Sequence, residues 1–169
     1  MSKVLIVSDS HGLTEELSAI KARHQISNLI HCGDSELDFN TDELEGFYKV
    51  RGNCDMDSMF PNEEVITIDG LTFFVTHGHL YNVKMNLMKL SYRAEEVGAN
   101  VICFGHTHIA GAEKIDRQLF INPGSIRLPR NRPEPTYAVM EWETVQSISV
   151  QFYTVDGQLV QDMNFQGSL

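Results

Sequence analysis

The sequence lacks any apolar stretch near the roughly 20 residues that a membrane-spanning helix needs. No leader is evident either, because Met1–Val4 runs straight into a predicted strand, and we therefore expect no signal peptide. Cysteine is scarce: there are three, an odd number, and each lies in or beside an apolar run. This usage favours reduced thiols in a cytoplasmic protein over a disulfide framework.

Basic residues are also few, with 13 Lys and Arg against 23 Asp and Glu, which gives a formal net charge of -10. Affinity for nucleic acid rests largely on Lys and Arg that neutralise phosphates, so we do not expect long nucleic acids as partners. Local charge decides what enters a cleft, and a cleft that holds divalent cations would still accept small phosphate esters.

The chain shows no internal repeat, low-complexity tract or linker. Its 169 residues, 42% of them hydrophobic, are enough for one domain with a real core, which we expect to span residues 1–169.

Five apolar runs have the length and the β-branched or aromatic content of buried strands. They are residues 4–7, 29–30, 48–50, 73–75 and 101–104. Hydrophobic spacing predicts helices over residues 13–23 and 83–97, and Asp69-Gly70 predicts a hairpin turn. After residue 109, strand pairs at 112–122 and 137–155 predict a second, largely antiparallel sheet packed on the first. Residues 36–45 are read as a weak helix or a loop, and residues 122–135 as an irregular loop.

Each of the five runs ends in a polar cluster. Because ligands bind beyond the carboxyl ends of neighbouring parallel strands, these clusters should meet at one edge of a sheet. In an extended segment residues i and i+2 share a side, so Asp9 and His11 could reach one cation. The candidate ligands are Asp9, His11, Asp34, Asn53, His77, His106 and His108. This mixed nitrogen and oxygen set without thiolate suits Mn, Fe, Ni, Co or Zn rather than Ca, and Mg only weakly.

Taken in order, the polar clusters resemble the calcineurin-like metallophosphoesterases, most closely their small bacterial and archaeal phosphodiesterase branch. The resemblance rests on Asp9-Ser10-His11, Gly33-Asp34, Gly52-Asn53-Cys54-Asp55, His77-Gly78-His79 and Gly105-His106-Thr107-His108. It implies an α/β fold, a four-layer αββα sandwich of two mixed β-sheets flanked by helices. It also implies a phosphodiesterase that hydrolyses small phosphate esters through a dinuclear metal centre and a metal-bound hydroxide.

The same resemblance implies two divalent metal ions, with Mn the first choice and Ni, Co, Fe, Zn or Mg as alternatives. The first metal would be held by Asp9, His11, Asp34 and His108. The second would be held by Asp34, Asn53, His77 and His106. Asp34 would then bridge the two, and we count Asp34, Asn53 and His77 as catalytic as well as metal-binding.

Many members of the superfamily carry a His after the Gly-Asn pair, placed to protonate the leaving oxygen, and here that position is Cys54. Cys54, Asp55, His79 and Arg127 are candidates for contact with substrate or for support of the site. Asp55 could equally cap the turn after Asn53. Arg127 could equally be a solvent-exposed loop residue without a role in the site. We expect His31 to serve packing alone.

Two alternatives remain open from the sequence. The eukaryotic retromer complex contains a scaffold subunit similar to this family, and a scaffold descendant should have lost ligands, whereas none is missing here. A metal-dependent phosphomonoesterase is the other alternative. Exposed strand edges would also allow a homodimer.

Overall fold

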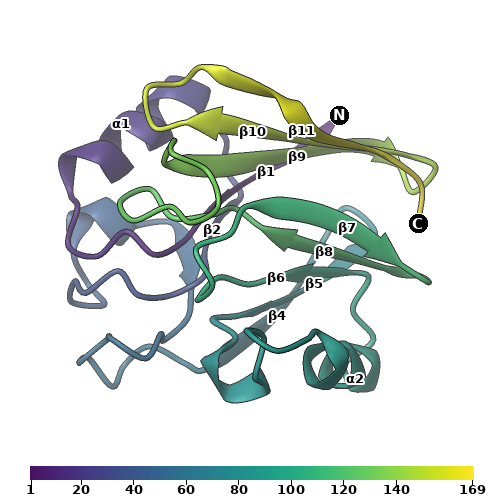
Figure 1. Ribbon diagram of the computed structural model, residues 1–169, viewed down its shortest axis with the longest axis horizontal. Coiled ribbons are helices and arrows are strands. Elements are labelled where there is room, and N and C mark those ends of the chain that lie inside the picture. Colours follow the sequence, from purple (N-terminus) through teal and green to yellow (C-terminus); the bar gives the residue numbers. More distant parts are fainter.

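The computed structural model describes residues 1–169, and it stacks two β-sheets face to face with one helix on each outer side (Figure 1). Sheet A contains, in spatial order, β11 (Leu159–Gly167), β10 (Ser147–Thr154), β9 (Thr136–Thr144), β1 (Ser2–Val7), β2 (Leu29–His31) and β3 (Phe47–Lys49). Sheet B contains β4 (Glu63–Ile68), β5 (Leu71–Thr76), β6 (Val101–Cys103), β8 (Gln118–Asn122) and β7 (Gly111–Ile115). The helices are α1 (Glu15–His24) and α2 (Met88–Glu96), with 3₁₀ turns η1 (Asp42–Leu44) and η2 (His79–Tyr81).

The central strands are buried on both faces, which accounts for their unbroken apolar runs. In β1, Val4 and Ile6 point into the core between the two sheets, while Leu5 and Val7 pack in the layer that contains α1. Alternation along a strand sends neighbouring side chains to opposite faces, so both faces need apolar residues. A third cluster fills the layer between sheet B and α2. The expected four-layer sandwich of two mixed sheets is confirmed.

Parallel pairing places the functional loops. β1, β2 and β3 run parallel to one another in sheet A, and β5, β6 and β8 do so in sheet B. The loops that follow these strands therefore leave the sandwich at one edge, on the left in Figure 1. No helix in the structure is both long and apolar enough to cross a membrane.

Three expectations from the sequence are corrected. The later strands do not form a separate antiparallel sheet, because β9 pairs with β1 and β8 pairs with β6. The helix expected over residues 83–97 covers only Met88–Glu96, since Asn82 adopts a left-handed conformation and turns precede the helix. The final strand β11 was not expected, and it pairs with β10 at the edge of sheet A.

Candidate metal centre

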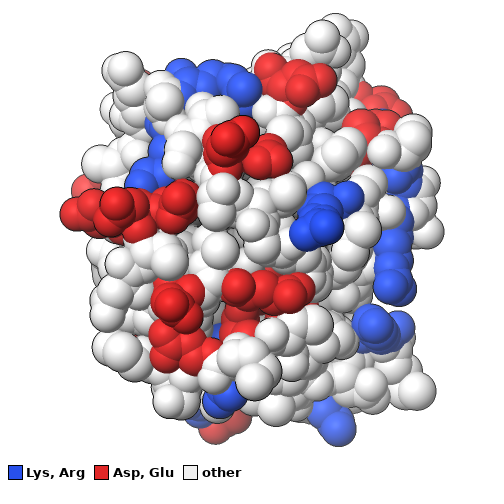
Figure 2. Space-filling view, turned by 90° about the vertical axis from the view of Figure 1, so that its left-hand side faces the viewer, with Lys and Arg blue, Asp and Glu red and all other residues white.

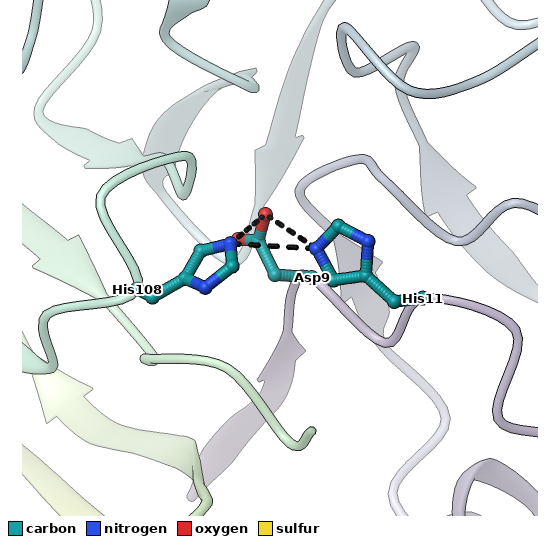
Figure 3. Close-up of side chains that lie close together, drawn as sticks. All are labelled: Asp9, His11 and His108. Carbon is teal, nitrogen blue, oxygen red and sulfur yellow. Dashed lines mark hydrogen bonds and ion pairs between the residues drawn. The ribbon is translucent and has the colours of Figure 1, made fainter. Parts of the chain in front are cut away.

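Side chains that follow three strands, β1, β5 and β6, converge on one carboxylate oxygen, Oδ1 of Asp9. The Nε2 atoms of His108, His77 and His11 lie 3.1, 3.7 and 3.8 Å from it. Figure 3 shows the Asp9 carboxylate between the rings of His11 and His108. These residues are far apart in the sequence. They meet where parallel strands of both sheets end, and the expectation of one edge of a single sheet was wrong.

Asp34 lies between the two groups of histidines. Its Oδ2 is 3.2 Å from His77 Nε2 and 4.0 Å from His11 Nε2, while its Oδ1 accepts the Cys54 N–H at 2.8 Å. One carboxylate oxygen thus faces ligands assigned to both proposed metals.

Main-chain carbonyls fix the orientation of two of the imidazoles. His77 donates its Nδ1–H to Cys32 O at 2.7 Å, and His108 donates its Nδ1–H to Leu128 O at the same distance. A neutral ring that carries its proton on Nδ1 and donates it in a hydrogen bond keeps a lone pair on Nε2. Both lone pairs are aimed at the carboxylates of the cluster.

The buried atoms at the centre fit a cation. Asp9 Oδ1 and His77 Nε2 are both buried without a hydrogen-bond partner. Buried polar groups are rarely left unpaired, because each such group costs about 1–3 kcal/mol. Lone pairs of nitrogen and oxygen that face one another repel unless a proton or a cation lies between them. The donor set also lacks a thiolate among its buried members, which suits divalent transition metals.

The Asp and His side chains of the cluster shift one another's pKa values. Burial opposes ionisation of Asp9, but its contacts with His108 and His77 outweigh burial and lower its pKa. Burial is likewise outweighed at Asp34, where the His77 contact holds the pKa well below its usual range. The Asp9 contact raises the pKa of His108, and Asp34 raises that of His77 against the effect of burial. The carboxylates and imidazoles of the cluster therefore stabilise one another's charged forms.

We expected from the sequence that the ligand loops are extended, but their backbone is not. Positive φ angles occur at five of the seven candidate ligands: Asp9, His11, Asp34, His106 and His108. Residues other than glycine in this region are strained, and they persist only where the surrounding structure holds them. Asp9 and His11 reach the same place through a left-handed turn, and the i, i+2 argument for them was wrong.

Asp55 holds two of these loops together. Its buried carboxylate accepts three main-chain N–H groups, from Gly52 at 2.7 Å, Glu36 at 2.8 Å and Asp34 at 2.9 Å. It therefore supports the site, and it does so by joining the loop after β2 to the loop after β3.

The two remaining candidate ligands lie at the border of the cluster. The His106 ring packs 5.1 Å from the His77 ring, and its main-chain N–H donates to Asp9 Oδ2. Burial and the neighbouring His77 lower the pKa of His106 to about 4. Asn53 is exposed, and its amide contacts only the Cys54 sulfur, at 3.6 Å. The structure does not bring the Asn53 side chain into contact with the other candidate ligands.

Three of the supporting candidates surround the cluster. The exposed Cys54 lies beside His11 and Glu36. The His79 ring packs 5.4 Å from the His77 ring, and its Nδ1 is buried without a partner. Arg127 donates from its guanidinium to the carbonyl of His11 at the exposed rim. None of the three is placed at the centre.

Sequence reasoning missed two supporting side chains. His31 was expected only to pack, yet its Nε2 lies 2.8 Å from Ser10 Oγ and its Nδ1 accepts the Gly33 N–H at 3.1 Å. It thus joins the loops after β1 and β2, and burial lowers its pKa to about 4. Glu36 was expected only to lie in a weak helix or a loop, yet its carboxylate contacts His11 Nδ1 at 2.5 Å. No local sequence pattern indicates the contacts of His31 or of Glu36.

A two-sheet sandwich that gathers His and Asp side chains at its parallel strand ends fits the metal-dependent phosphoesterases that the motifs resemble. The comparison of sequences agrees. This chain belongs to the calcineurin-like phosphoesterase superfamily, whose domain matches residues 2–145. The family that the motifs predicted is confirmed.

Individual relatives are similar over nearly their whole length. The chain is 49% identical over 162 residues to "Probable metallophosphoesterase YsnB" of Bacillus subtilis, covering 95% of each. It is 29% identical over 188 residues to "Phosphodiesterase YfcE" of Escherichia coli, covering 94% of this chain and 98% of YfcE.

Solved structures agree with the fold. A predicted phosphoesterase of Streptococcus pneumoniae superposes with a TM-score of 0.95 at 32% identity, covering 99% of this chain and 98% of that one. Vps29 of Entamoeba histolytica complexed with zinc superposes with a TM-score of 0.76 at 19% identity, covering 99% of this chain and 98% of that one. The likeness to Vps29 concerns the fold alone.

Proposed function

We propose that this protein hydrolyses phosphodiester bonds of small phosphate esters at a dinuclear metal centre. The observation that carries the proposal is the buried oxygen Oδ1 of Asp9, which has no hydrogen-bond partner although three imidazole nitrogens point toward it. An arrangement of this kind is costly without a cation and favourable with one.

In this proposal Asp9, His11, Asp34 and His108 hold the first cation, and Asp34, Asn53, His77 and His106 hold the second. The position of Asp34 Oδ2 between His77 and His11 supports a bridging role. The exposed Asn53 amide must rotate away from Cys54 to bind. Two divalent cations would supply the positive charge that stabilises a phosphoryl group and activates water.

The protein's own residues prepare this chemistry. Asp34 stays ionised at neutral pH, because its pKa lies well below its usual range. Cys32 O and Leu128 O hold the imidazoles of His77 and His108 in position, which removes the cost of orienting them. The guanidinium of Arg127 lies at the rim, where its remaining N–H groups could bind a phosphate oxygen.

The surface charge supports a small substrate. Figure 2 views the molecule from the side of the left-hand loops of Figure 1, and acidic side chains are spread over this face while basic ones stand mostly toward its edges. With a net charge of -10, a long polyanion would be repelled outside the cleft. A small ester that reaches the cations meets much less of this repulsion.

Hydrolysis of a panel of esters tests the proposal. The panel contains aryl and alkyl phosphodiesters and matched monoesters, with Mn²⁺, Ni²⁺, Co²⁺, Mg²⁺ or Zn²⁺ added singly to metal-stripped protein. We expect hydrolysis of aryl diesters with Mn²⁺ as the best activator. Faster hydrolysis of monoesters would favour the phosphomonoesterase. No hydrolysis with any metal by a folded protein would favour the scaffold alternative.

Cys54 should limit the choice of leaving group. Burial, the nearby Asp34 and other carboxylates raise the pKa of the Cys54 thiol to about 11, so the thiol is a poor proton donor. A general acid typically contributes about 10²–10⁴-fold. Cys54→His is therefore expected to raise the turnover of alkyl esters by up to about 100-fold. The turnover of aryl esters should change little.

The measurement is the dependence of kcat on the pKa of the leaving alcohol, which should become shallower in Cys54→His. Cys54→Ser serves as the control, because a hydroxyl is no better acid than the thiol. An equal change across the whole leaving-group series would contradict the prediction.

A further inference from the structure

His11 differs from His77 and His108 in how its outer nitrogen is held. Those two rings donate Nδ1–H to main-chain carbonyls, which no substitution removes. The Nδ1 of His11 instead faces a side chain, the Glu36 carboxylate, at 2.5 Å. In Figure 3 this nitrogen points away from Asp9 and out of the cluster.

Glu36 is held in place for this contact. Its main-chain N–H donates to Asp55 Oδ1 at 2.8 Å, and its backbone is left-handed, with a φ of 56°. Two main-chain hydrogen bonds tie the same loops, from His11 N to Asp34 O at 2.9 Å and from Gly12 N to Ser35 O at 2.8 Å. The Glu36 side chain is 43% exposed, so its contact with His11 is not forced by packing.

We propose that Glu36 is a positioning residue that holds His11 with Nε2 toward the first metal and strengthens His11 as a ligand. This inference rests on the proposed dinuclear centre. A carboxylate that accepts the outer N–H fixes the ring orientation and raises the basicity of the nitrogen that binds the metal. His77 faces the second metal and has a carbonyl partner, so Glu36 acts on one metal of the two.

The contacts of Glu36 explain why it should affect only the first metal site. Glu36 touches His11, which belongs only to the first ligand set, and it makes no side-chain contact with His77 or His106. Removal of partners of this kind typically costs about 10–100-fold in metal affinity. We therefore expect the first site to weaken by this factor and the second site to keep its affinity.

Calorimetric titration of metal-stripped protein with Mn²⁺ tests the proposal in two backgrounds. His106→Ala weakens the second site and leaves the first to be measured, whereas His108→Ala does the reverse. Glu36→Ala should weaken Mn²⁺ binding by about 10–100-fold in the His106→Ala background and leave it unchanged in the His108→Ala background. Glu36→Gln, which keeps an oxygen acceptor for Nδ1–H, should restore part of the loss.

Glu95→Gln is the matched control, since Glu95 is exposed on α2 and makes no side-chain hydrogen bond or ion pair. Glu95→Gln also removes one negative charge, and it should leave the Mn²⁺ affinity of both metal sites unchanged. Equal weakening of both sites, no weakening of either, or a third ion lost with Glu36 would overturn the proposal. If the wild-type protein itself fails to bind two Mn²⁺ ions, the proposed function fails instead.

Discussion

Asp34→Asn is expected to lower kcat/KM for an aryl phosphodiester by more than about 100-fold and to reduce metal content below two ions per chain. The loss should exceed the roughly 10–100-fold typical of residues that only support a ligand. Asparagine keeps the shape of the side chain and an oxygen that can accept the Cys54 N–H. It removes the negative charge that faces both His77 and His11.

The charge matters because Asp34 is ionised in the folded protein. Its contact with His77 holds its pKa well below the usual range, so the substitution changes the charge of the site at every pH used for assay. Asp38→Asn is the control, because Asp38 lies in the same loop, is exposed and makes no side-chain hydrogen bond. Metal content and kcat/KM are measured on the same preparations. Two tightly bound ions in Asp34→Asn would refute the bridging role.

The strands that lead into the site could be predicted because their burial is visible in their composition. β1 presents Val4 and Ile6 to one core and Leu5 and Val7 to another, so its apolar run is unbroken. The polar residues that follow such a run stand out for the same reason. Burial on two faces therefore revealed both the strands and the positions of the candidate ligands.

The arrangement of the later strands could not be predicted in the same way. β11 buries only Val160, and its other residues are exposed or partly exposed, so its sequence has no periodic apolar signal. β9 pairs with β1 from more than a hundred residues away, for example Val139 with Leu5. Such pairing depends on which edge is free once the sheets have formed, and local sequence does not encode that choice.

The supporting contacts of the site were hidden for a related reason. His31 and Glu36 act on loops other than their own, and folding decides which groups they meet. Asp55 was a candidate for support, but the main-chain groups that it binds could not be predicted. The left-handed conformations of Asp9 and His11 are likewise imposed by contacts from other loops, so the assumption of an extended chain was wrong there. The motifs predicted candidate ligands, of which Asp9, His11, Asp34, His77 and His108 lie close together. The contacts that hold these side chains could not be predicted.

Gly52→Ala is expected to reduce kcat/KM by about 100-fold or more, although glycine itself binds nothing. A Cβ at position 52 would lie 2.0 Å from Asp34 Oδ1 and 2.5 Å from the main-chain nitrogen of Asp34. Real Cβ contacts are never this short, so one of the two loops must move. A displacement of about 1 Å at a reacting site can cost about 10²-fold in rate.

The loops cannot separate without further loss. The Gly52 N–H donates to Asp55 Oδ2 at 2.7 Å, and the same oxygen accepts the Asp34 N–H at 2.9 Å, so a shift that relieves the clash strains both hydrogen bonds. We expect the free energy of unfolding to fall by about 1–3 kcal/mol, as for other substitutions that overfill a packed site. Denaturant unfolding of the metal-free protein measures this, alongside kcat/KM and Mn²⁺ affinity of the loaded enzyme.

Gly111→Ala is the matched control, because a Cβ at position 111 in β7 meets no atom within 4 Å and the residue has no positive φ. It should leave activity and metal affinity unchanged. If Gly52→Ala behaved like Gly111→Ala, the loop after β3 would have to be pliable, and close approach of the backbone to Asp34 would not be a requirement of the site. If it lost activity while keeping both stability and metal affinity, the displacement would act on substrate position rather than on the ligands.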